Sequence, residues 1–505
     1  MIRALPVLLL LTASARAAEP TDFALIIGVN QSGDASLAPL RYADDDAARY
    51  RDFFHAVGAR TYLLATLDEN TRRLHPEAAA EAAPARDAQL TSTVERLTAD
   101  VARAQRGGYL TTLYVVYAGH GQVEGETGYV NLEDGRLTGP ALAARVLNRV
   151  RADRSHVIVD ACSSYFFALG RGSSGQRRPA HGFSQLGGTL VEQRDVGLLL
   201  STSSARESHE WAAFQAGVFS HEVRSGMFGA ADADGNGIIS YAEIAAFIMR
   251  ANQSIPNEKY RPEVFWRPPR GSSALVDLRG ALARRVEIPP DDKGHYYLED
   301  PGGVRLADFH TGRRGVQLLR PAGAAPRLYL RRTRDDREFV LPAGDGAVST
   351  AGLVAQEPHV TTRSAAHEAF SALFSLPFDE GAVTEVLSHP EGLLAEPAEP
   401  KPSLGARRVT GLSLLGLSAL SAAGGTWAYL SARSLRDQIP PGASMEEVAD
   451  TNRRIASRNR LAAAAAGVAG AAALSGLLLY LWPEAPPVSA GVSASSVTLE
   501  LRATF

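Results

Sequence analysis

The sequence contains very little cysteine and lysine and no excess of either charge. Cys162 is the only cysteine among 505 residues, which excludes an intramolecular disulfide and a zinc site built from several thiolates. The 52 basic residues nearly balance the 55 acidic ones, so the charge does not indicate a nucleic-acid partner. Only three basic residues are lysine, a bias that we interpret as coding composition. Hydrophobic residues make up 45% of the chain, which is typical of a globular protein, and the length suggests about three domains at about 150 residues each.

The first 17 residues have the features of a secretory signal peptide. Arg3 gives the positive start, residues 4–11 form a short apolar run, and Ala15 to Ala17 offer a cleavage site of small residues. The apolar run is too short to span a bilayer. The alternative is a disordered N-terminus. We expect the signal peptide, 1–17, and therefore an exported protein.

Two C-terminal stretches, 409–430 and 461–482, are predicted to be transmembrane helices. Each holds 22 uncharged residues, which form a helix about 33 Å long at ~1.5 Å per residue, enough to cross the bilayer core. Six arginines fall in the loop predicted at 431–460, which the positive-inside rule places in the cytoplasm. The predicted location is the cell envelope, in a bacterial inner membrane, with the N-terminal domain and a short tail, 483–505, in the periplasm. Two alanine-rich soluble helices are the alternative.

Residues 20–278 alternate short apolar runs with helical patterns, which predicts an α/β fold with a mainly parallel sheet covered on both faces. Residues 43–57 form a good amphipathic helix that begins in three aspartates. Residues 284–350 change to alternating hydrophobicity broken by glycine and proline, which predicts a small β-rich accessory domain. Residues 351–408 are expected to be a partly helical linker. The predicted strands of the sheet are 23–29, 112–117, 156–159 and 196–201.

Two of these predicted strands end in reactive residues, and active sites in parallel sheets lie at the carboxyl ends of strands. His120, flanked by two glycines, follows one strand, and Cys162 follows the next one along the chain. His120 and Cys162 are 42 positions apart, which allows one helical crossover between neighbouring parallel strands. An imidazole beside a thiol can take its proton and return it to a leaving amine. The backbone N–H groups of Gly121 and Cys162 can hold the oxyanion, so we predict peptide-bond hydrolysis through a thioester.

Each of these residues also has an ordinary structural interpretation. A single cysteine after a strand is often a small buried hydrophobic residue, and a histidine there is often a hydrogen-bonded loop residue. Three other histidines are weaker partners for the thiol. His156 begins the strand that leads to the cysteine, and His209 and His221 lie beyond the following strand.

These motifs resemble those of the caspase-like clan of cysteine peptidases, and most closely the bacterial caspase and metacaspase group. The resemblance implies a caspase-type αβα sandwich with a His120–Cys162 dyad that acts on a protein or peptide substrate. In metacaspase-like members an aspartate two residues before the cysteine helps to form an acidic S1 pocket, so Asp160 is predicted to select arginine or lysine at P1. Its alternative role is to order the active-site loop. The blocks that carry the resemblance are 23–30, 40–47, 117–121, 160–162, 199–204, 207–210 and 217–220.

The chain departs from that family directly after the cysteine. Members usually continue with His-Ser-Gly, whereas Ser163, Ser164 and Tyr165 stand here. Tyr165 replaces a glycine with a bulky ring next to the cysteine, so it is expected to affect the turnover rate or the shape of the pocket. Arg177 and Arg178 occur where caspase-like enzymes carry an inter-subunit linker, so we expect self-cleavage there. The alternative function is a catalytically inactive caspase-like signalling or scaffold protein that binds calcium, which Tyr165 favours. A structural envelope anchor with an incidental thiol is a third possibility.

Residues 232–243 match the twelve-residue EF-hand calcium loop. Oxygen ligands occupy loop positions 1, 3, 5, 9 and 12, and Gly237 stands at the sixth position, where the chain turns sharply. The alternative is a polar turn between two helices without a metal. We predict Ca²⁺ as a cofactor, structural or regulatory, and no organic cofactor. The predicted ligands are Asp232, Asp234, Asn236, Ile238 through its carbonyl, Ser240 and Glu243.

Overall fold

A computed structural model describes most of the chain, which separates into two compact units, residues 1–398 and 399–505. The predicted signal peptide, the predicted tail, and Arg177 with Arg178 all lie outside the described residues. The described residues are 21–124, 127–162, 164–169, 190, 193–202, 210–211, 214–256, 261–321, 327–358, 372–389, 393–394, 406–439 and 444–481.

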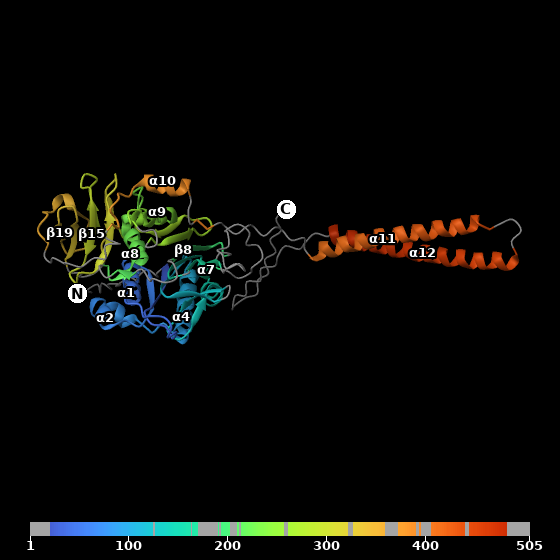
Figure 1. Ribbon diagram of the computed structural model, residues 1–505, viewed down its shortest axis with the longest axis horizontal. Helices are drawn as coiled ribbons and strands as arrows, with labels where there is room; N and C mark the ends of the chain where they lie inside the picture. Colours follow the sequence, from blue (N-terminus) through green and yellow to red (C-terminus); the bar gives the residue numbers. More distant parts are fainter. Residues whose placement is uncertain are drawn as a thin grey trace, which may run out of the picture. The chain divides into compact units, whose positions relative to one another are not determined.

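A six-stranded sheet forms the centre of the first unit, in the order β12-β8-β7-β3-β1-β2 (Figure 1). Five strands run parallel, and β12 pairs antiparallel with β8 at one edge. The predicted α/β fold with a mainly parallel sheet is therefore confirmed. The strands are β1 (Asp22–Val29), β2 (Arg60–Ala65), β3 (Thr112–Gly119), β7 (Arg154–Asp160), β8 (Val196–Thr202) and β12 (Glu263–Arg267).

Helices cover both faces of this sheet, and alternate strand residues enter two different cores. In β1, Ala24 and Ile26 pack into one core, while Leu25 and Ile27 pack into the other. Burial on both faces explains why this strand is continuously apolar. The first core includes α1 (Ala43–Ala56), α3 (Pro76–Glu81), α8 (Val218–Ser225) and α9 (Tyr241–Asn252). The second includes α4 (Asp87–Arg106), α5 (Gly139–Leu142), the π-helical segment η1 (Ala143–Leu147), α6 (Asn148–Val150) and α7 (Ser164–Leu169).

Smaller elements connect these layers. α2 (Glu69–Leu74) precedes α3, and the π-helical segment η3 (Gly226–Ala230) extends α8 toward the predicted calcium loop. Three short strands after His120 form a separate sheet, β4 (Gly121–Glu124), β5 (Thr127–Asn131) and β6 (Arg136–Thr138). Two further pairs are β9 (Glu210–Trp211) with β10 (Ala216–Gly217), and β11 (Ile238–Ser240) with β13 (Ala274–Asp277).

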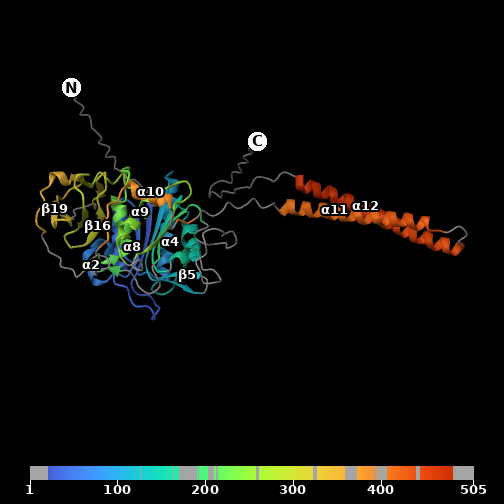
Figure 2. The same ribbon diagram turned by 45° about the horizontal axis from the view of Figure 1, so that its top comes forward.

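The segment predicted as an accessory β domain consists of strands, but it is part of the first compact unit. Val286, Phe309 and Leu318 belong to the same hydrophobic core as α1 and α8. β16 lies against α8 (Figure 2), where His221 Nε2 is 2.8 Å from Asp308 Oδ2. One sheet contains β17 (Val316–Leu319), β14 (Arg285–Ile288) and β20 (Val348–Ser349), and the other contains β16 (Arg305–His310), β15 (His295–Glu299), β18 (Leu328–Arg332) and β19 (Arg337–Leu341).

The chain after β20 contains a 3₁₀ turn, η5 (Thr350–Gly352), and one described helix, α10 (Glu380–Ser388). The second unit is a hairpin of two long helices, α11 (Ala406–Asp437) and α12 (Met445–Leu481). Close packing uses glycine, because a Cβ on Gly411 would lie 2.8 Å from the carbonyl oxygen of Gly476. Among the described helices, α12 is long and apolar enough to cross a membrane.

The prediction of a loop over residues 431–460 is wrong in its extent, because most of this segment is helical. Residues 431–437 continue α11, and residues 445–460 lie within α12. Arginine, alanine and glutamate are good helix formers, so this charged stretch extends both helices instead of forming a loop.

Candidate active site and EF-hand loop

His120 and Cys162 line one cleft at the carboxyl ends of β3 and β7. The parallel register pairs Ala118 with Asp160, and continuing it by two residues sets His120 opposite Cys162. The two residues are therefore brought together by neighbouring strands of the sheet. Asp46, Asp160 and Glu210 also line the cleft.

A backbone carbonyl determines the orientation of the His120 ring. The Nε2 atom lies 2.8 Å from the carbonyl oxygen of Ala38, in the loop between β1 and α1. A carbonyl can only accept a hydrogen bond, so Nε2 carries the proton in this contact. Nδ1 is then the basic nitrogen of the neutral ring. This arrangement leaves Nδ1 as the ring nitrogen that can accept a proton.

Cys162 is partly exposed, in the connection between β7 and α7. Gly121, which follows His120, lies so close to Cys162 that a Cβ on Gly121 would overlap the carbonyl oxygen of Cys162. The same Cβ would lie 3.0 Å from the side chain of Ala161. A glycine at position 121 thus allows the backbones of the two strand ends to meet. It brings the backbone of Gly121, one of the two predicted oxyanion donors, to Cys162.

Asp160 ends β7 with its carboxyl group inside the cleft. Its Oδ2 accepts hydrogen bonds from the backbone N–H of Ser220 at 3.0 Å and from the Ser220 hydroxyl at 2.6 Å. Burial raises the pKa of Asp160 to about 7, and the nearby carboxylate of Asp46 adds to the shift. Asp160 therefore changes its charge near neutral pH.

Two further carboxyl groups face the same cleft, and sequence reasoning did not assign them to the site. Asp46 on α1 accepts from the N–H of Gly217 at 2.8 Å and forms a 2.6 Å ion pair with Arg224, although burial raises its pKa. Glu210 on β9 accepts from the N–H groups of Arg41 and Tyr42, and burial raises its pKa also. The described residues that line the cleft include no lysine or arginine.

The sequence patterns around Asp46 and Glu210 indicated roles other than lining the cleft. Asp46 stands in a run of three aspartates that marks the start of α1. Glu210 belongs to a sequence block of the resemblance, yet its contact with Arg41 joins residues 169 positions apart. Only the tertiary fold brings Asp46 and Glu210 to Asp160.

Two of the rival histidines have structural roles. His156 is buried, its Nδ1 lies 2.8 Å from the hydroxyl of Tyr241, and burial lowers its pKa to about 3. His221 is buried against Asp308, and burial lowers its pKa to about 4. Neither residue lines the cleft. His209 and the side chain of Tyr165 lie outside the part of the chain that the structure describes.

The predicted calcium ligands lie together between η3 and α9. Ligand oxygens of Asp232, Asp234 and Glu243 all lie within 4.8 Å of one another. Gly237 has a φ of +77°, which glycine adopts readily and which the sharp turn requires. Ser240 caps α9 by accepting from the N–H of Glu243, whose carboxylate accepts from Ser240 in return. Three converging carboxylates are a donor set that suits a hard divalent cation.

The predicted calcium loop does not pair with a second such loop in the described chain. Its strand β11 pairs antiparallel with β13, which follows the central-sheet edge strand β12. Asn236 donates to Asp234 and accepts from the N–H of Ile238. The loop is thus held in shape by its own hydrogen bonds and by β13.

Sequence comparison finds no matching protein family and no matching curated protein. Comparison with solved structures finds the crystal structure of caspase-1 from Spodoptera frugiperda, at 12% identity and a TM-score of 0.29, covering 50% of this chain and 87% of that chain. A structure of pro-sf-caspase-1 matches at 12% identity and a TM-score of 0.28, covering 52% of this chain and 94% of that chain.

Proposed function

We propose that the chain is a caspase-like cysteine endopeptidase in which Cys162 is the nucleophile and His120 the general base and acid. The observation that carries this proposal is that both residues line one cleft, at the ends of neighbouring parallel strands. The hydrogen bond from His120 Nε2 to Ala38 supports it, because it leaves Nδ1 as the base. The partial exposure of Cys162 allows a substrate to reach the sulfur.

The proposed reaction proceeds in two steps. His120 Nδ1 takes the thiol proton as the sulfur of Cys162 attacks the scissile carbonyl carbon, and the imidazolium then protonates the departing amine. The N–H groups of Gly121 and Cys162 stabilise the oxyanion, and one such donor is typically worth about 3–4 kcal/mol of barrier. Water, deprotonated by His120, hydrolyses the thioester and restores the thiol.

We propose cleavage after arginine or lysine. Asp160 and Glu210 are acidic groups of the cleft, whereas Asp46 is already paired with Arg224, so a basic P1 side chain finds complementary partners in the first two. Asp160 is the predicted selector because it directly precedes the nucleophile segment. We also propose that the peptidase cleaves itself at Arg177 and Arg178, since both would present a basic P1 residue.

Fluorogenic peptides test the function. The full-length protein in detergent is expected to cleave substrates with arginine or lysine at P1 and to leave aspartate at P1 uncut. Cys162→Ala and His120→Ala are expected to reduce kcat by at least about a thousandfold. His389→Ala, which changes an exposed histidine at the end of α10, is the matched control and keeps full activity.

The competing function is the inactive caspase-like signalling or scaffold protein, favoured by Tyr165 in place of the family's glycine. A protein that binds calcium but cleaves none of these peptides, even after limited trypsin treatment to process any precursor, would favour the scaffold. Mass spectrometry of the active enzyme tests self-cleavage. An active enzyme with an intact chain at Arg177 and Arg178 would exclude it.

We propose that the loop 232–243 binds one Ca²⁺ ion. The convergence of Asp232, Asp234 and Glu243 supports this, and the carbonyl of Ile238 and the side chains of Asn236 and Ser240 would complete the ligands. Calorimetry is expected to show one site, which Glu243→Gln removes because an amide cannot bind with two anionic oxygens. Glu95→Gln, an exposed site on α4, is the control.

We propose that α11 and α12 anchor the protein as a hairpin in a bacterial inner membrane, with the peptidase in the periplasm. The length and apolarity of α12 and the arginines between the two apolar stretches support this. Protease added to spheroplasts is expected to digest the peptidase unit while it leaves the connection near residue 440 intact. Protection of the peptidase unit instead would reverse the orientation.

A further inference from the structure

A second cavity of about 520 Å³ lies in the first unit, and none of its lining residues belongs to the peptidase cleft. Its walls come from α1, the turn between α2 and α3, the end of α8 with η3, and the accessory strands. Four arginines line it, together with His55 and His75. Arg49, Arg51, Arg224 and His75 are buried, whereas Arg73 and His55 are exposed. Burying a guanidinium is costly unless its N–H groups and its charge are matched by partners.

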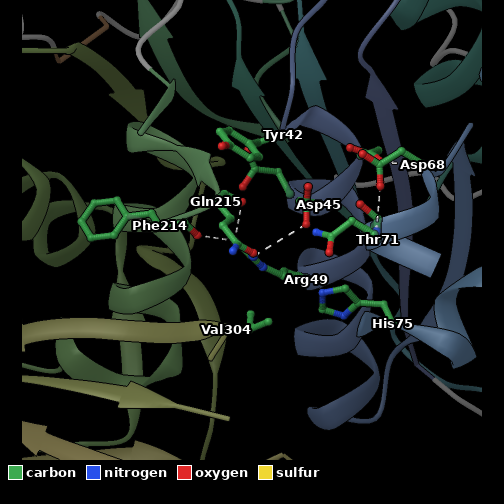
Figure 3. A network of polar contacts seen from close by, with 12 residues as sticks. Tyr42, Asp45, Arg49, Asp68, Thr71, His75, Phe214, Gln215 and Val304 are labelled. Atoms are coloured by element: carbon green, nitrogen blue, oxygen red, sulfur yellow. Dashed lines mark hydrogen bonds and ion pairs between the residues drawn. The ribbon is translucent and has the colours of Figure 1, made fainter. Parts of the chain in front are cut away.

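Arg49 is the central basic group of this cavity. Its side chain is 3% exposed, and its Nη1 donates to the carbonyl oxygens of Phe214 and Gln215 at 2.8 Å each (Figure 3). Its Nε and Nη2 make no hydrogen bond with any described residue. Asp45 Oδ1 lies 3.8 Å from Nη2, beyond hydrogen-bonding distance. Nε and Nη2 of this buried cation therefore make no hydrogen bond in the described chain, and Nη2 has only the long ion pair with Asp45.

Arg224 and His75 repeat this pattern in the same cavity. Arg224 is 1% exposed and uses Nη1 for Asp46, while its Nη2 has no hydrogen bond in the described chain. His75 is 6% exposed, with Nδ1 2.7 Å from Asp52, and its Nε2 likewise has no described partner. Figure 3 shows Arg49 with His75 and Val304 around it. Three side chains from separate elements thus line one cavity, and each has a buried polar atom without a hydrogen-bond partner in the described chain.

The remaining lining limits what can bind. Asp52 and Glu77 bond to Arg51, so their charges are already matched. Asp300 accepts from the N–H of Val304 at 2.8 Å, and its carboxyl group interacts electrostatically with Arg49 and His75. The apolar part of the lining includes Leu74, Phe228, Leu306 and Leu328 with three prolines, and we call it the apolar wall.

We propose that this cavity binds a small organic anion, with a phosphate or carboxylate group on an apolar body. Arg49 and Arg224 would donate to the anionic oxygens, since guanidinium groups bind both anions in a planar, often bidentate contact. His75 lies beside them, and the leucines and Phe228 contact the apolar body. Inorganic anions lack an apolar body that could contact the leucines and Phe228, so they are expected to bind less tightly.

The site is connected to the peptidase cleft through the same arginines. Arg49 donates to the carbonyls of Phe214 and Gln215, which closely precede the cleft residue Gly217. Arg224 forms an ion pair with Asp46, whose carboxylate lines the cleft. Ligand binding is therefore expected to change the KM for peptides with a basic P1 residue. This consequence rests on the proposed peptidase function, whereas the binding itself does not.

Isothermal titration calorimetry of the full-length protein in detergent tests the site with phenyl phosphate and phenylacetate, which separate the two anion types. At least one is expected to bind with one-to-one stoichiometry, more tightly than inorganic phosphate, and phenol is expected not to bind. Failure of both probes would mean that the cavity holds water only and would overturn the proposal. Inorganic phosphate binding as tightly as phenyl phosphate would overturn the role of the apolar wall.

Four variants assign the binding to this cavity. Arg49→Gln is expected to weaken binding by about tenfold or more, and Asp300→Asn to strengthen it several-fold by removing a like charge. Leu306→Trp fills the cavity without changing a charge, so it tests the site even if Arg49→Gln fails to fold. Arg72→Gln, an exposed α2 residue outside the cavity, is the control. Wild-type binding by Leu306→Trp would overturn the location.

Discussion

Replacing Asp160 by asparagine is expected to stabilise the protein in alkaline solution. Burial raises the pKa of Asp160 to about 7 in the folded protein, from about 3.9 in an unfolded chain. Between these values the folded state holds a proton that the unfolded state has released. The free energy of unfolding therefore decreases as the pH rises through this range, and it levels off above about pH 7. Asparagine is never charged, so this loss disappears in the variant.

The size of the effect follows from the shift. About three pKa units at about 1.4 kcal/mol each give an upper limit near 4 kcal/mol. The nearby carboxyl group of Asp46 interacts with Asp160, so part of the free-energy cost of burying negative charge remains in the variant. Asparagine also loses the ionic part of the hydrogen bonds that Asp160 makes with Ser220. We therefore expect a gain of about 1–3 kcal/mol at about pH 8, and no more than a small difference at about pH 4.

Urea denaturation of the full-length protein in detergent, followed by tryptophan fluorescence at several pH values, measures this difference. Asp291→Asn, at an exposed loop carboxylate, is the control. A constant difference between Asp160→Asn and the wild type across the whole pH range would refute the argument. The same variant is expected to lose about 10- to 100-fold in kcat/KM for arginine at P1, because a charge-assisted contact becomes a neutral one.

Gly121→Ala is expected to abolish activity in a folded protein, because the added methyl group overlaps the carbonyl of Cys162. Gly135→Ala, where the added methyl group has open space, is expected to keep activity. Peptide cleavage measures the activity of both variants, and circular dichroism checks that both are folded. Gly476→Leu is expected to separate α11 from α12, which loss of an engineered cross-link between them measures, while Gly467→Leu has no neighbour within 4 Å and leaves the hairpin intact. A chain ending at residue 278 is expected to be insoluble or unfolded by circular dichroism, whereas one ending at 398 folds, because the accessory strands complete the core.

The sequence predicted the central sheet because each inner strand is buried on both faces and is therefore a continuous apolar run. β2 and β12 lacked that signal. β2 begins with Arg60 and Thr61, and β12, from Glu263 to Arg267, lies at the antiparallel edge and carries a charge at each end. Edge strands have one neighbour, so their sequences are less strongly constrained than those of central strands.

His120 and Cys162 were predictable for a different reason. Both follow directly from strand ends, and parallel strand ends meet at one edge of a sheet. Asp46 and Glu210 had no such signal, because α1 and β9 reach the cleft only through tertiary packing. The cavity around Arg49 was equally hidden. Its arginines are ordinary polar residues in the helical pattern of α1 and α8, and only the packed accessory strands enclose them.

Helix α8 explains why the cleft depends on strands that do not line it. All eight residues of α8 are buried. Ser220 bonds to Asp160 and Arg224 to Asp46, so the helix positions both of these cleft carboxyl groups. Its His221 pairs with Asp308 on the accessory strand β16, on another side of the same helix. A helix held on all sides cannot shift toward one neighbour without breaking its bonds to another. The accessory strands therefore determine the geometry of the acidic cleft through α8, which is why the predicted domain boundary near residue 278 does not separate two independent functions.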